Sequence, residues 1–202
     1  MAVIGITGGA GTGKSFVAGI AAERFDMLHI DTDKLARAQM MPGGVAYTGV
    51  AEAFPDCVMD GQIDRAALAK KVFGNKELLE NLNGLTHPFV REAVETLIKN
   101  AEGLFEHVLI ETAILADAGY CPICDAVWYV TAPLEDRKKR LAGRGYDAER
   151  IESVLGSQPS DEEYRKISTY VIYNGEDADG EKILEQIEEA ASLLPKRSLQ
   201  HE

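Results

Sequence analysis

Cysteine, basic charge and long apolar runs are all scarce in this sequence, and each shortage argues against a class of protein. Three cysteines among 202 residues are too few for a disulfide framework in a chain that can build its own core, so we expect a reducing, cytoplasmic compartment. No apolar run approaches the ~20 residues of a membrane span. The 21 basic and 33 acidic residues give a net charge of −12, which opposes neutralisation of a nucleic-acid backbone. We expect a monomer or weak homo-oligomer that binds neither membranes nor nucleic acid.

Short apolar segments alternate with longer periodic ones along the whole chain, which is typical of an α/β fold with a parallel sheet. With 46% apolar and 27% charged residues, the composition is that of a globular protein, and the length suits one domain. The expected strands are Ala2–Thr7, Leu28–Ile30, His107–Ile110, Ala126–Val130 and Tyr170–Ile172. The expected helices are Lys14–Arg24, Lys34–Met40, Arg65–Phe73, Lys76–Asn100, Leu134–Ala142, Ala148–Leu155, Asp161–Lys166 and Asp179–Leu194.

The strongest motif follows the first expected strand. Gly8-Gly9-Ala10-Gly11-Thr12-Gly13-Lys14-Ser15 matches G-x-x-x-x-G-K-[ST], a loop whose backbone N–H groups cradle phosphates in front of a helix. In such a loop Lys14 reaches the β- and γ-phosphates and the Ser15 hydroxyl binds Mg²⁺, so ATP and Mg²⁺ are the expected cofactors. A dinucleotide-binding loop is excluded because Lys14 stands in place of its last glycine. The residues expected to contact the nucleotide are Gly9, Ala10, Gly11, Thr12, Gly13, Lys14, Ser15 and Phe16.

An acidic pair, Asp31 and Asp33, follows the second expected strand. Carboxylates at the carboxyl edge of a parallel sheet face the same crevice as the phosphate loop, so either could take a proton from an acceptor hydroxyl. Asp31 also suits the N-cap of the helix that follows. From the residues alone, both readings of Asp31 stay open.

The sequence resembles the dephospho-coenzyme A kinase family along nearly its whole length. The shared strings are, in chain order, Thr7-Gly8-Gly9 before the rest of the loop, Ile30-Asp31-Thr32-Asp33-Lys34-Leu35-Ala36-Arg37, Gly61-Gln62-Ile63-Asp64-Arg65-Ala66-Ala67-Leu68 with Val72-Phe73, Thr86-His87-Pro88, Glu111-Thr112-Ala113-Ile114-Leu115, Arg140, Arg144, Ser157-Gln158 and Val171-Ile172-Tyr173-Asn174. The sequence departs from the pattern at two places. Thr32 replaces the usual Ala, and Ala116-Asp117 stands where an aromatic or apolar residue and Glu are common, which leaves any contact of Asp117 unassigned.

The resemblance implies transfer of the γ-phosphoryl group of ATP to the 3′-hydroxyl of dephospho-coenzyme A, the last step of coenzyme A biosynthesis. It implies that Asp33 is the general base and that Arg65, with the helices around it, holds the acceptor. His87, in the family's H-P string, is placed with the acceptor as well; alternatively it caps or packs a helix start. Arg140 and Arg144 are implied to be lid arginines that contact the nucleotide, Arg140 with a catalytic role.

These assignments define one phosphate-loop kinase domain over residues 1–202, built on a three-layer, P-loop NTPase-type parallel sheet. Its nucleotide-binding core is expected at about 1–33, 105–137 and 168–195. A helical substrate-binding insertion is expected at about 34–104, and a helical lid at about 138–167. The polar tail Lys196–Glu202 is expected to fray.

Three further groups have competing interpretations. Glu111 ends an apolar strand, where its carboxylate suits a Mg²⁺ site or a structural ion pair. The run Arg137-Lys138-Lys139 reads as a solvated helix face. Cys121 and Cys124 have metal-site spacing, but zinc needs two more ligands and Cys57 is the one remaining thiol, so we expect them to be incidental.

Two alternatives to the family's reaction remain from the sequence. One is a kinase for another small molecule, such as a nucleoside monophosphate or a sugar. The other is a nucleotide-dependent switch that binds ATP without a small acceptor. The acidic residue Asp33 favours an enzyme over a switch, and the strings around Arg65 and His87 favour dephospho-coenzyme A over other acceptors.

Overall fold

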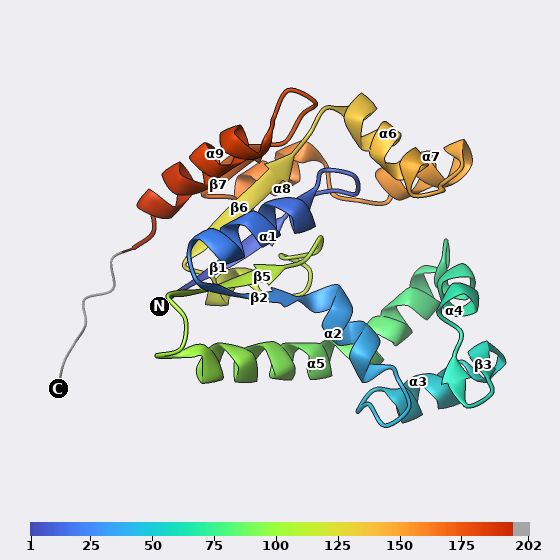
Figure 1. Ribbon diagram of the computed structural model, residues 1–202. Coiled ribbons are helices and arrows are strands. Elements are labelled where there is room, and N and C mark those ends of the chain that lie inside the picture. Colours follow the sequence, from blue (N-terminus) through green and yellow to red (C-terminus); the bar gives the residue numbers. More distant parts are fainter. Residues whose placement is uncertain (196–202) are drawn as a thin grey trace. The chain divides into compact units, whose positions relative to one another are not determined.

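The computed structural model describes residues 1–195, so the expectation for Lys196–Glu202 lies outside the described residues. The chain forms two compact units. One consists of Met1–Ile30 together with the chain from Ala101 onward, and the other is Asp31–Asn100. We call them the phosphate-loop unit and the helical unit. In Figure 1 the helical unit is the part coloured light blue to green.

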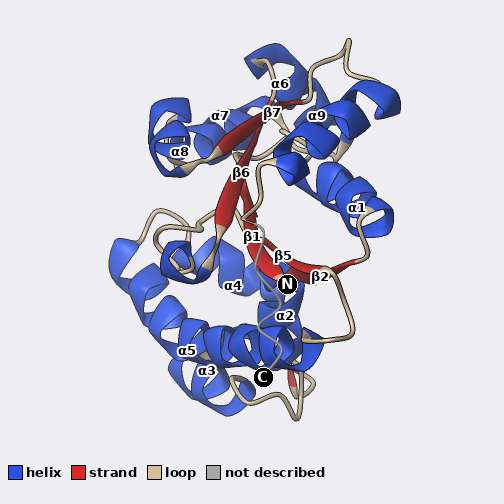
Figure 2. Cartoon of the chain, turned by 90° about the vertical axis from the view of Figure 1, so that its left-hand side faces the viewer, coloured by secondary structure: helices blue, strands red, loops and turns tan. Residues whose placement is uncertain are grey.

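A five-stranded sheet forms the centre of the phosphate-loop unit (Figure 2). Its strands are β1 (Ala2–Thr7), β2 (Met27–Asp31), β5 (His107–Glu111), β6 (Ala126–Thr131) and β7 (Tyr170–Tyr173), in the spatial order β2-β5-β1-β6-β7. Strand β1 pairs in parallel with β5 and β6, and β6 with β7. Every residue of β1 and β6 is buried, as expected for central strands covered on both faces. The chain leaves β1 toward one edge and later crosses to the other, so the loop after β1 lies at a topological switch point.

Two helices, α1 (Lys14–Arg24) and α9 (Gly180–Ser192), pack against the sheet and against each other (Figure 1). Their apolar faces share one core with the inner strands, which includes Val17, Ile187 and the fully buried Trp128. This packing anchors the helix that begins at the phosphate loop. The position of α1 therefore depends on residues from both ends of the chain.

Three short helices follow β6: α6 (Leu134–Gly143), α7 (Ala148–Gly156) and α8 (Asp161–Ile167). Helix α8 begins with a capping box, in which Ser160 and Glu163 satisfy each other's backbone N–H groups. Tyr164 of α8 stacks on Tyr129 of β6 with ring centroids 5.1 Å apart. The expected lid segment therefore has one end fixed on the sheet; its function as a lid stays a prediction.

The helical unit contains α2 (Thr32–Gln39), α3 (Tyr47–Ala53), α4 (Arg65–Val72) and most of α5 (Lys76–Ala101). Two short strands, β3 (Val58–Met59) and β4 (Gln62–Ile63), form an antiparallel hairpin. The unit has its own small core, whose buried members are Val50, Phe54, Cys57, Leu68 and Val72. Single turns of 3₁₀ helix occur at Pro55–Cys57 here and at Cys121–Ile123 in the other unit.

The expected α/β sheet and its eight helices are confirmed, with ends that differ by at most a few residues. The sequence analysis missed α3 and the hairpin. Helix α3 has no start signal, because its N-cap is Ala46 and no side chain caps it. The two-residue strands are too short to show an alternating pattern, although Asp60-Gly61 is a hairpin signal.

The alternative reading of His87 as a helix start is wrong. Thr86, His87 and Pro88 lie inside the 26-residue helix α5. Proline there removes one backbone donor, which would have paired with the carbonyl of Gly84. Both Gly84 and Pro88 are exposed, so solvent can satisfy that carbonyl and the helix continues. Among the described residues, no helix is long and apolar enough to cross a membrane.

Candidate active site

The phosphate loop joins β1 to α1 and depends on glycine at two positions in particular. At Gly8, φ is +146° and an added Cβ would lie 2.2 Å from the carbonyl oxygen of Val130. At Gly13, the N-cap of α1, φ is +89° and a Cβ would lie 2.2 Å from Nδ2 of Asn174. Both positions exclude a side chain, so the loop turns tightly and directs the first N–H groups of α1 toward a bound anion.

Lys14 begins α1 and its side chain folds back over the start of the loop. Its Nζ donates hydrogen bonds to the carbonyl oxygens of Gly8, at 2.6 Å, and Gly9, at 3.4 Å. The ammonium group is thereby held above the first two loop residues. In a phosphate loop this lysine reaches the β- and γ-phosphates, so the Gly8–Gly9 segment marks that end of the nucleotide site.

Ser15, Glu111 and His29 form a polar cluster beside the loop. The Ser15 hydroxyl donates to Glu111 Oε1 at 2.5 Å, and His29 Nε2 lies 2.9 Å from Glu111 Oε2. Glu111, at the end of β5, is 6% exposed. The structure therefore brings the two expected Mg²⁺ ligands together, and it places His29 at hydrogen-bond distance from the same carboxylate.

Arg140 of α6 is engaged with backbone carbonyls on the far side of the loop. Its Nη1 donates to the oxygens of Gly11 and Thr12 at 3.1 and 3.3 Å, and its Nη2 donates to that of Asn174 at 2.8 Å. The buried Asn174, just after β7, donates from Nδ2 to the same Thr12 oxygen at 2.8 Å. These bonds tie the middle of the loop to α6 and to the last strand.

Arg137, three positions earlier on α6, is in contact with the other end of the loop. Its Nε donates to the Ala10 carbonyl oxygen at 3.0 Å, and its side chain is only 12% exposed. The Ala10 N–H donates in turn to Oε1 of Gln158 at 2.6 Å. The expectation of a solvated face is wrong for Arg137, because the carbonyl and the loop backbone shield its guanidinium from water.

The other basic residues of this segment do face solvent. Lys138 and Lys139 pair with Glu152 and Glu176 on the surface, and each partner holds the pKa of its lysine above the usual value. Arg144 is the C-cap of α6 and is exposed, and no hydrogen bond of its side chain occurs within residues 1–195. Because α6 ends at Gly143, Arg140 lies inside the helix and Arg144 lies just beyond its last residue.

The remaining expected nucleotide contact, Phe16, lies on the first turn of α1. Its ring is 54% exposed and its backbone N–H donates to the Gly13 carbonyl at 3.0 Å. An exposed aromatic ring at the start of this helix is an apolar surface next to the loop. Its contact with a nucleotide stays a prediction.

In the helical unit, Asp31 caps α2 by accepting the Lys34 N–H at 3.0 Å, which confirms the cap reading. Asp33 lies in the first turn of α2 and is exposed. Arg65 is the first residue of α4, directly after its cap Asp64, and is exposed as well. Their roles as base and acceptor contact stay predictions.

His87 is half-buried in the middle of α5. Burial lowers the pKa of His87, so its imidazole is uncharged at neutral pH. A neutral ring can donate or accept a hydrogen bond but adds no positive charge for a phosphate. Any contact of His87 with an acceptor is therefore a hydrogen bond from or to a neutral ring, or a packing contact.

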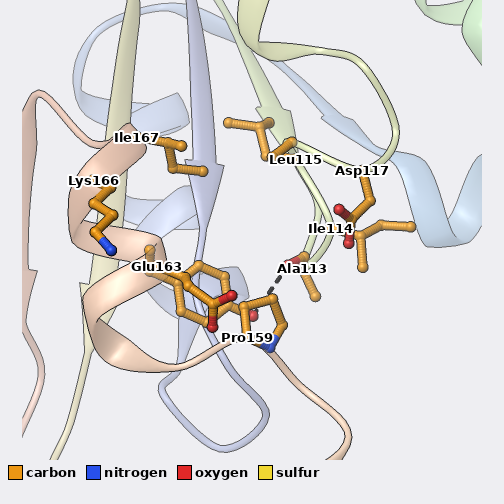
Figure 3. Close-up of a pocket in the computed structure, with 10 residues that line it drawn as sticks. Ala113, Ile114, Leu115, Asp117, Pro159, Glu163, Lys166 and Ile167 are labelled. Carbon is orange, nitrogen blue, oxygen red and sulfur yellow. Dashed lines mark hydrogen bonds between the residues drawn. The ribbon is translucent and has the colours of Figure 1, made fainter.

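A cavity of about 260 Å³ lies between the segment after β5 and helix α8 (Figure 3). Its walls are mainly apolar, with Ile114 on one side and Ile167 on the other, and Asp117, Glu163 and Lys166 add charge. Burial raises the pKa of Tyr164 to about 12, so its hydroxyl stays protonated and donates to the Ala113 carbonyl at 3.2 Å. Asp117, the residue at which the sequence departs from the family pattern, thus lies at this cavity and outside the phosphate loop.

All three cysteines are free thiols. Cys121 and Cys124 flank the 3₁₀ turn, and no group of three or more possible metal ligands occurs within residues 1–195. Burial raises the pKa of Cys124 to about 12, which keeps its thiol protonated and unreactive at neutral pH.

Four residues that contact or support the loop were given no role in the sequence analysis: His29, Arg137, Gln158 and Asn174. Some signals were present. His29 is two positions before Asp31 on a strand, so both point to one face, and Arg137 is one helical turn before Arg140. Gln158 and Asn174 fall within family strings, but nothing local indicates which loop atom they bind.

The family model and the curated relatives agree on one family. The model of the dephospho-CoA kinase family matches residues 2–179. The dephospho-CoA kinase of Moorella thermoacetica is 40% identical over 185 residues, covering 88% of this chain and 85% of that protein. The solved structure of TT1252 from Thermus thermophilus is 31% identical, with a TM-score of 0.83 over 96% of this chain and 98% of that one. A dephospho-CoA kinase structure from Campylobacter jejuni, at 20% identity and a TM-score of 0.66 over 94% and 95% of the two chains, shares the fold.

Proposed function

This chain belongs to the dephospho-CoA kinase family, and on that premise we propose how its residues divide the work of the reaction. The protein is a phosphotransferase that uses ATP to phosphorylate dephospho-CoA in the biosynthesis of CoA. The acceptor is the 3′-hydroxyl, and the products are CoA and ADP. The observation that carries the proposal is the convergence of Lys14, Ser15 and Glu111 at the phosphate loop of a chain matched by the family over most of its length.

The phosphate-loop unit binds the nucleotide. The loop backbone and the start of α1 cradle the phosphates, and Lys14 exchanges its carbonyl partners for β- and γ-phosphate oxygens. Phe16 packs against the nucleotide from the exposed face of α1. Arg140 holds the loop by its carbonyl oxygens, and the exposed Arg144 contributes positive charge to the bound phosphates.

The Ser15 hydroxyl and the Glu111 carboxylate fit a magnesium ion. Both supply oxygen ligands, and Ser15 Oγ lies 2.5 Å from Glu111 Oε1 beside the loop. Magnesium in kinases takes one or two protein ligands and completes its shell with phosphate oxygens and water. When bound, the ion neutralises charge on the transferring phosphate.

The helical unit supplies the acceptor side of the reaction. Asp33 accepts the proton of the 3′-hydroxyl as that oxygen attacks the γ-phosphorus. Its first-turn position on α2 leaves its carboxylate exposed, and the neighbouring Asp31 is already committed to the cap. Arg65 pairs with phosphate oxygens of dephospho-CoA, and the neutral His87 contributes a hydrogen bond.

The three free thiols suit a reducing compartment, so we also place the reaction in the cytoplasm. We propose a monomer or weak homo-oligomer. The net charge of −12 opposes binding to nucleic acid, and the reaction needs none. We therefore propose ATP and dephospho-CoA as the binding partners.

A competition among acceptors tests the proposed function. We would measure release of the nucleoside diphosphate, ADP from ATP or GDP from GTP, with dephospho-CoA, AMP, shikimate and gluconate offered separately at equal concentration. We expect release with dephospho-CoA to exceed release with every other acceptor by about 10²-fold or more, as expected for a site built to bind one acceptor's polar groups. Mass spectrometry of the product should give CoA. ADP release that is equal with and without an acceptor would indicate a nucleotide switch, and preference for another acceptor would reject the assigned substrate.

A further inference from the structure

We propose that Arg137 is a further catalytic residue, whose guanidinium contacts the γ-phosphoryl group of ATP and follows it during transfer. This inference rests on the proposed function, because it assigns a role within the same phosphate site. It begins from the location of Arg137 relative to Lys14. Lys14 Nζ is held at the Gly8 and Gly9 carbonyls, which marks the β/γ end of the loop.

Arg137 lies at that same end. A Cβ built on Gly9 would be 2.3 Å from Arg137 Nη2, so this nitrogen lies directly against the Gly9 backbone. The Nε donates to the next carbonyl, that of Ala10, at 3.0 Å. The guanidinium thus borders the loop within two residues of the carbonyls that hold the Lys14 ammonium.

The positive charge of Arg137 is shielded from water but weakly compensated. The side chain is 12% exposed, yet its one acidic partner within residues 1–195 is Asp161, at 3.7 Å from Nη1, and that carboxylate is 54% exposed. A guanidinium carries five N–H donors, and within residues 1–195 the Arg137 side chain donates a hydrogen bond from Nε alone. A phosphate oxygen is the acceptor that such a fork binds best, and low water access strengthens the interaction.

Arg140 differs in each of these respects. Its two terminal nitrogens are already bound to the carbonyls of Gly11, Thr12 and Asn174. Arg140 therefore positions the loop, while Arg137 keeps terminal nitrogens at the end where charge develops. Two arginines one helical turn apart on α6 thus bind different carbonyls of the same loop, Arg137 that of Ala10 and Arg140 those of Gly11 and Thr12.

Two nucleotides distinguish a γ-phosphate contact from a purely structural tie to the loop. We would measure ATP and ADP affinities by calorimetry for Arg137→Ala, Arg137→Lys and Arg137→Gln, together with kcat for dephospho-CoA. Loss of a charged hydrogen bond to the γ-phosphate should weaken ATP binding by about 10- to 100-fold in the Ala and Gln variants. Because ADP lacks the γ-phosphate, its affinity should change by less than about 3-fold, and kcat should fall by about 10²-fold or more. The Lys variant should be intermediate because it keeps the charge without the fork.

Lys138→Ala is the matched control, since that residue pairs with Glu152 on the surface of the same helix, and it should leave all three quantities unchanged. Equal weakening of ATP and ADP binding by the Arg137 variants would show that Arg137 only holds the loop and would overturn the inference, as would no change in either. If Arg137→Ala unfolds, the test uses Arg137→Gln instead, provided that its melting temperature is close to that of the unaltered protein. A failure of the unaltered protein to phosphorylate dephospho-CoA would instead reject the proposed function, and the ATP-to-ADP affinity ratio would still test Arg137.

Discussion

The two units of this protein support their candidate side chains in opposite ways. In the phosphate-loop unit, residues far apart in the sequence converge on one loop: Ser15 and Glu111 are 96 positions apart, and Ala10 and Arg137 are 127 apart. In the helical unit, the described hydrogen bonds near the candidate residues are local. Asp31 caps the turn that contains Asp33, and Asp64 caps the turn that begins at Arg65.

This difference shows which part of the site depends on the global fold. The phosphate loop has its geometry imposed by α1, α6, β5 and the residue after β7, so a substitution at a distant position can alter it. Asp33 and Arg65 depend first on their own helix turns. Substitutions in the phosphate-loop unit should therefore affect nucleotide and metal binding together with rate, whereas those in the helical unit should affect rate or acceptor binding alone.

Lys14→Ala should have the largest effect, because it removes the ammonium group that stabilises the negative charge of the phosphates both in bound ATP and in the transition state. We expect kcat/KM for ATP to fall by about 10³- to 10⁵-fold, with losses in both kcat and ATP affinity. Steady-state kinetics with dephospho-CoA, together with ATP calorimetry, would measure both. Near-normal turnover would mean that this loop is not the catalytic phosphate site.

Asp33→Asn is the corresponding change in the helical unit and should separate rate from binding. The amide is nearly isosteric but cannot take a proton, so kcat should fall by about 10²- to 10⁴-fold. ATP affinity, measured by calorimetry, should change little.

Asp31→Asn provides the control for Asp33, because asparagine is as good an N-cap as aspartate and should cost little stability or rate. If Asp31→Asn is the impaired variant and Asp33→Asn is active, the base has been assigned to the wrong residue. A loss of ATP affinity in Asp33→Asn would break the distinction between the two units.

His29→Ala tests whether distant support matters in the phosphate-loop unit. His29 Nε2 lies 2.9 Å from Glu111 and should orient that carboxylate toward Mg²⁺. Removing such a supporting hydrogen bond should raise the Mg²⁺ concentration needed for half-maximal activity by about 10-fold. Binding of Mn²⁺ with ATP, followed by electron paramagnetic resonance, should weaken in parallel. His29→Asn, which keeps a donor, should recover part of the loss, and an unchanged metal dependence would contradict the proposed support.

Changing Cys121 and Cys124 together to Ser should have the smallest effect. The pair belongs to the phosphate-loop unit, but within residues 1–195 neither cysteine side chain forms a hydrogen bond with the phosphate loop or with Glu111. Because Cys124 packs near Gly5 and Leu115, stability should drop by about 1 kcal/mol, and activity in reductant should not change. Thermal unfolding and turnover would be compared with the unaltered protein. Stoichiometric zinc that disappears in the double variant would show that the pair binds metal after all.

Local sequence determined much of this protein. The periodicity of apolar residues specified the five main strands and eight of the helices, and the glycine-rich string located the phosphate loop. For Asp31 the sequence raised the N-cap as one of two readings, because an N-cap bonds a backbone N–H three residues away, and the structure confirmed it. Each of these features depends on neighbours within one or two turns, which is why spacing along the chain was sufficient.

The tertiary structure decided which side chains support the loop. Because Lys138 and Lys139 follow it in the sequence, we expected Arg137 to face solvent. The fold instead places its side chain against Gly9 and Ala10. The fold also brings His29 to Glu111 and Asn174 to Thr12. The distances between these residues along the sequence do not reveal either contact. The physical reason is that the order of strands in the sheet and the packing of α6 bring these residues together, and both follow from burial of the whole core rather than from any local pattern.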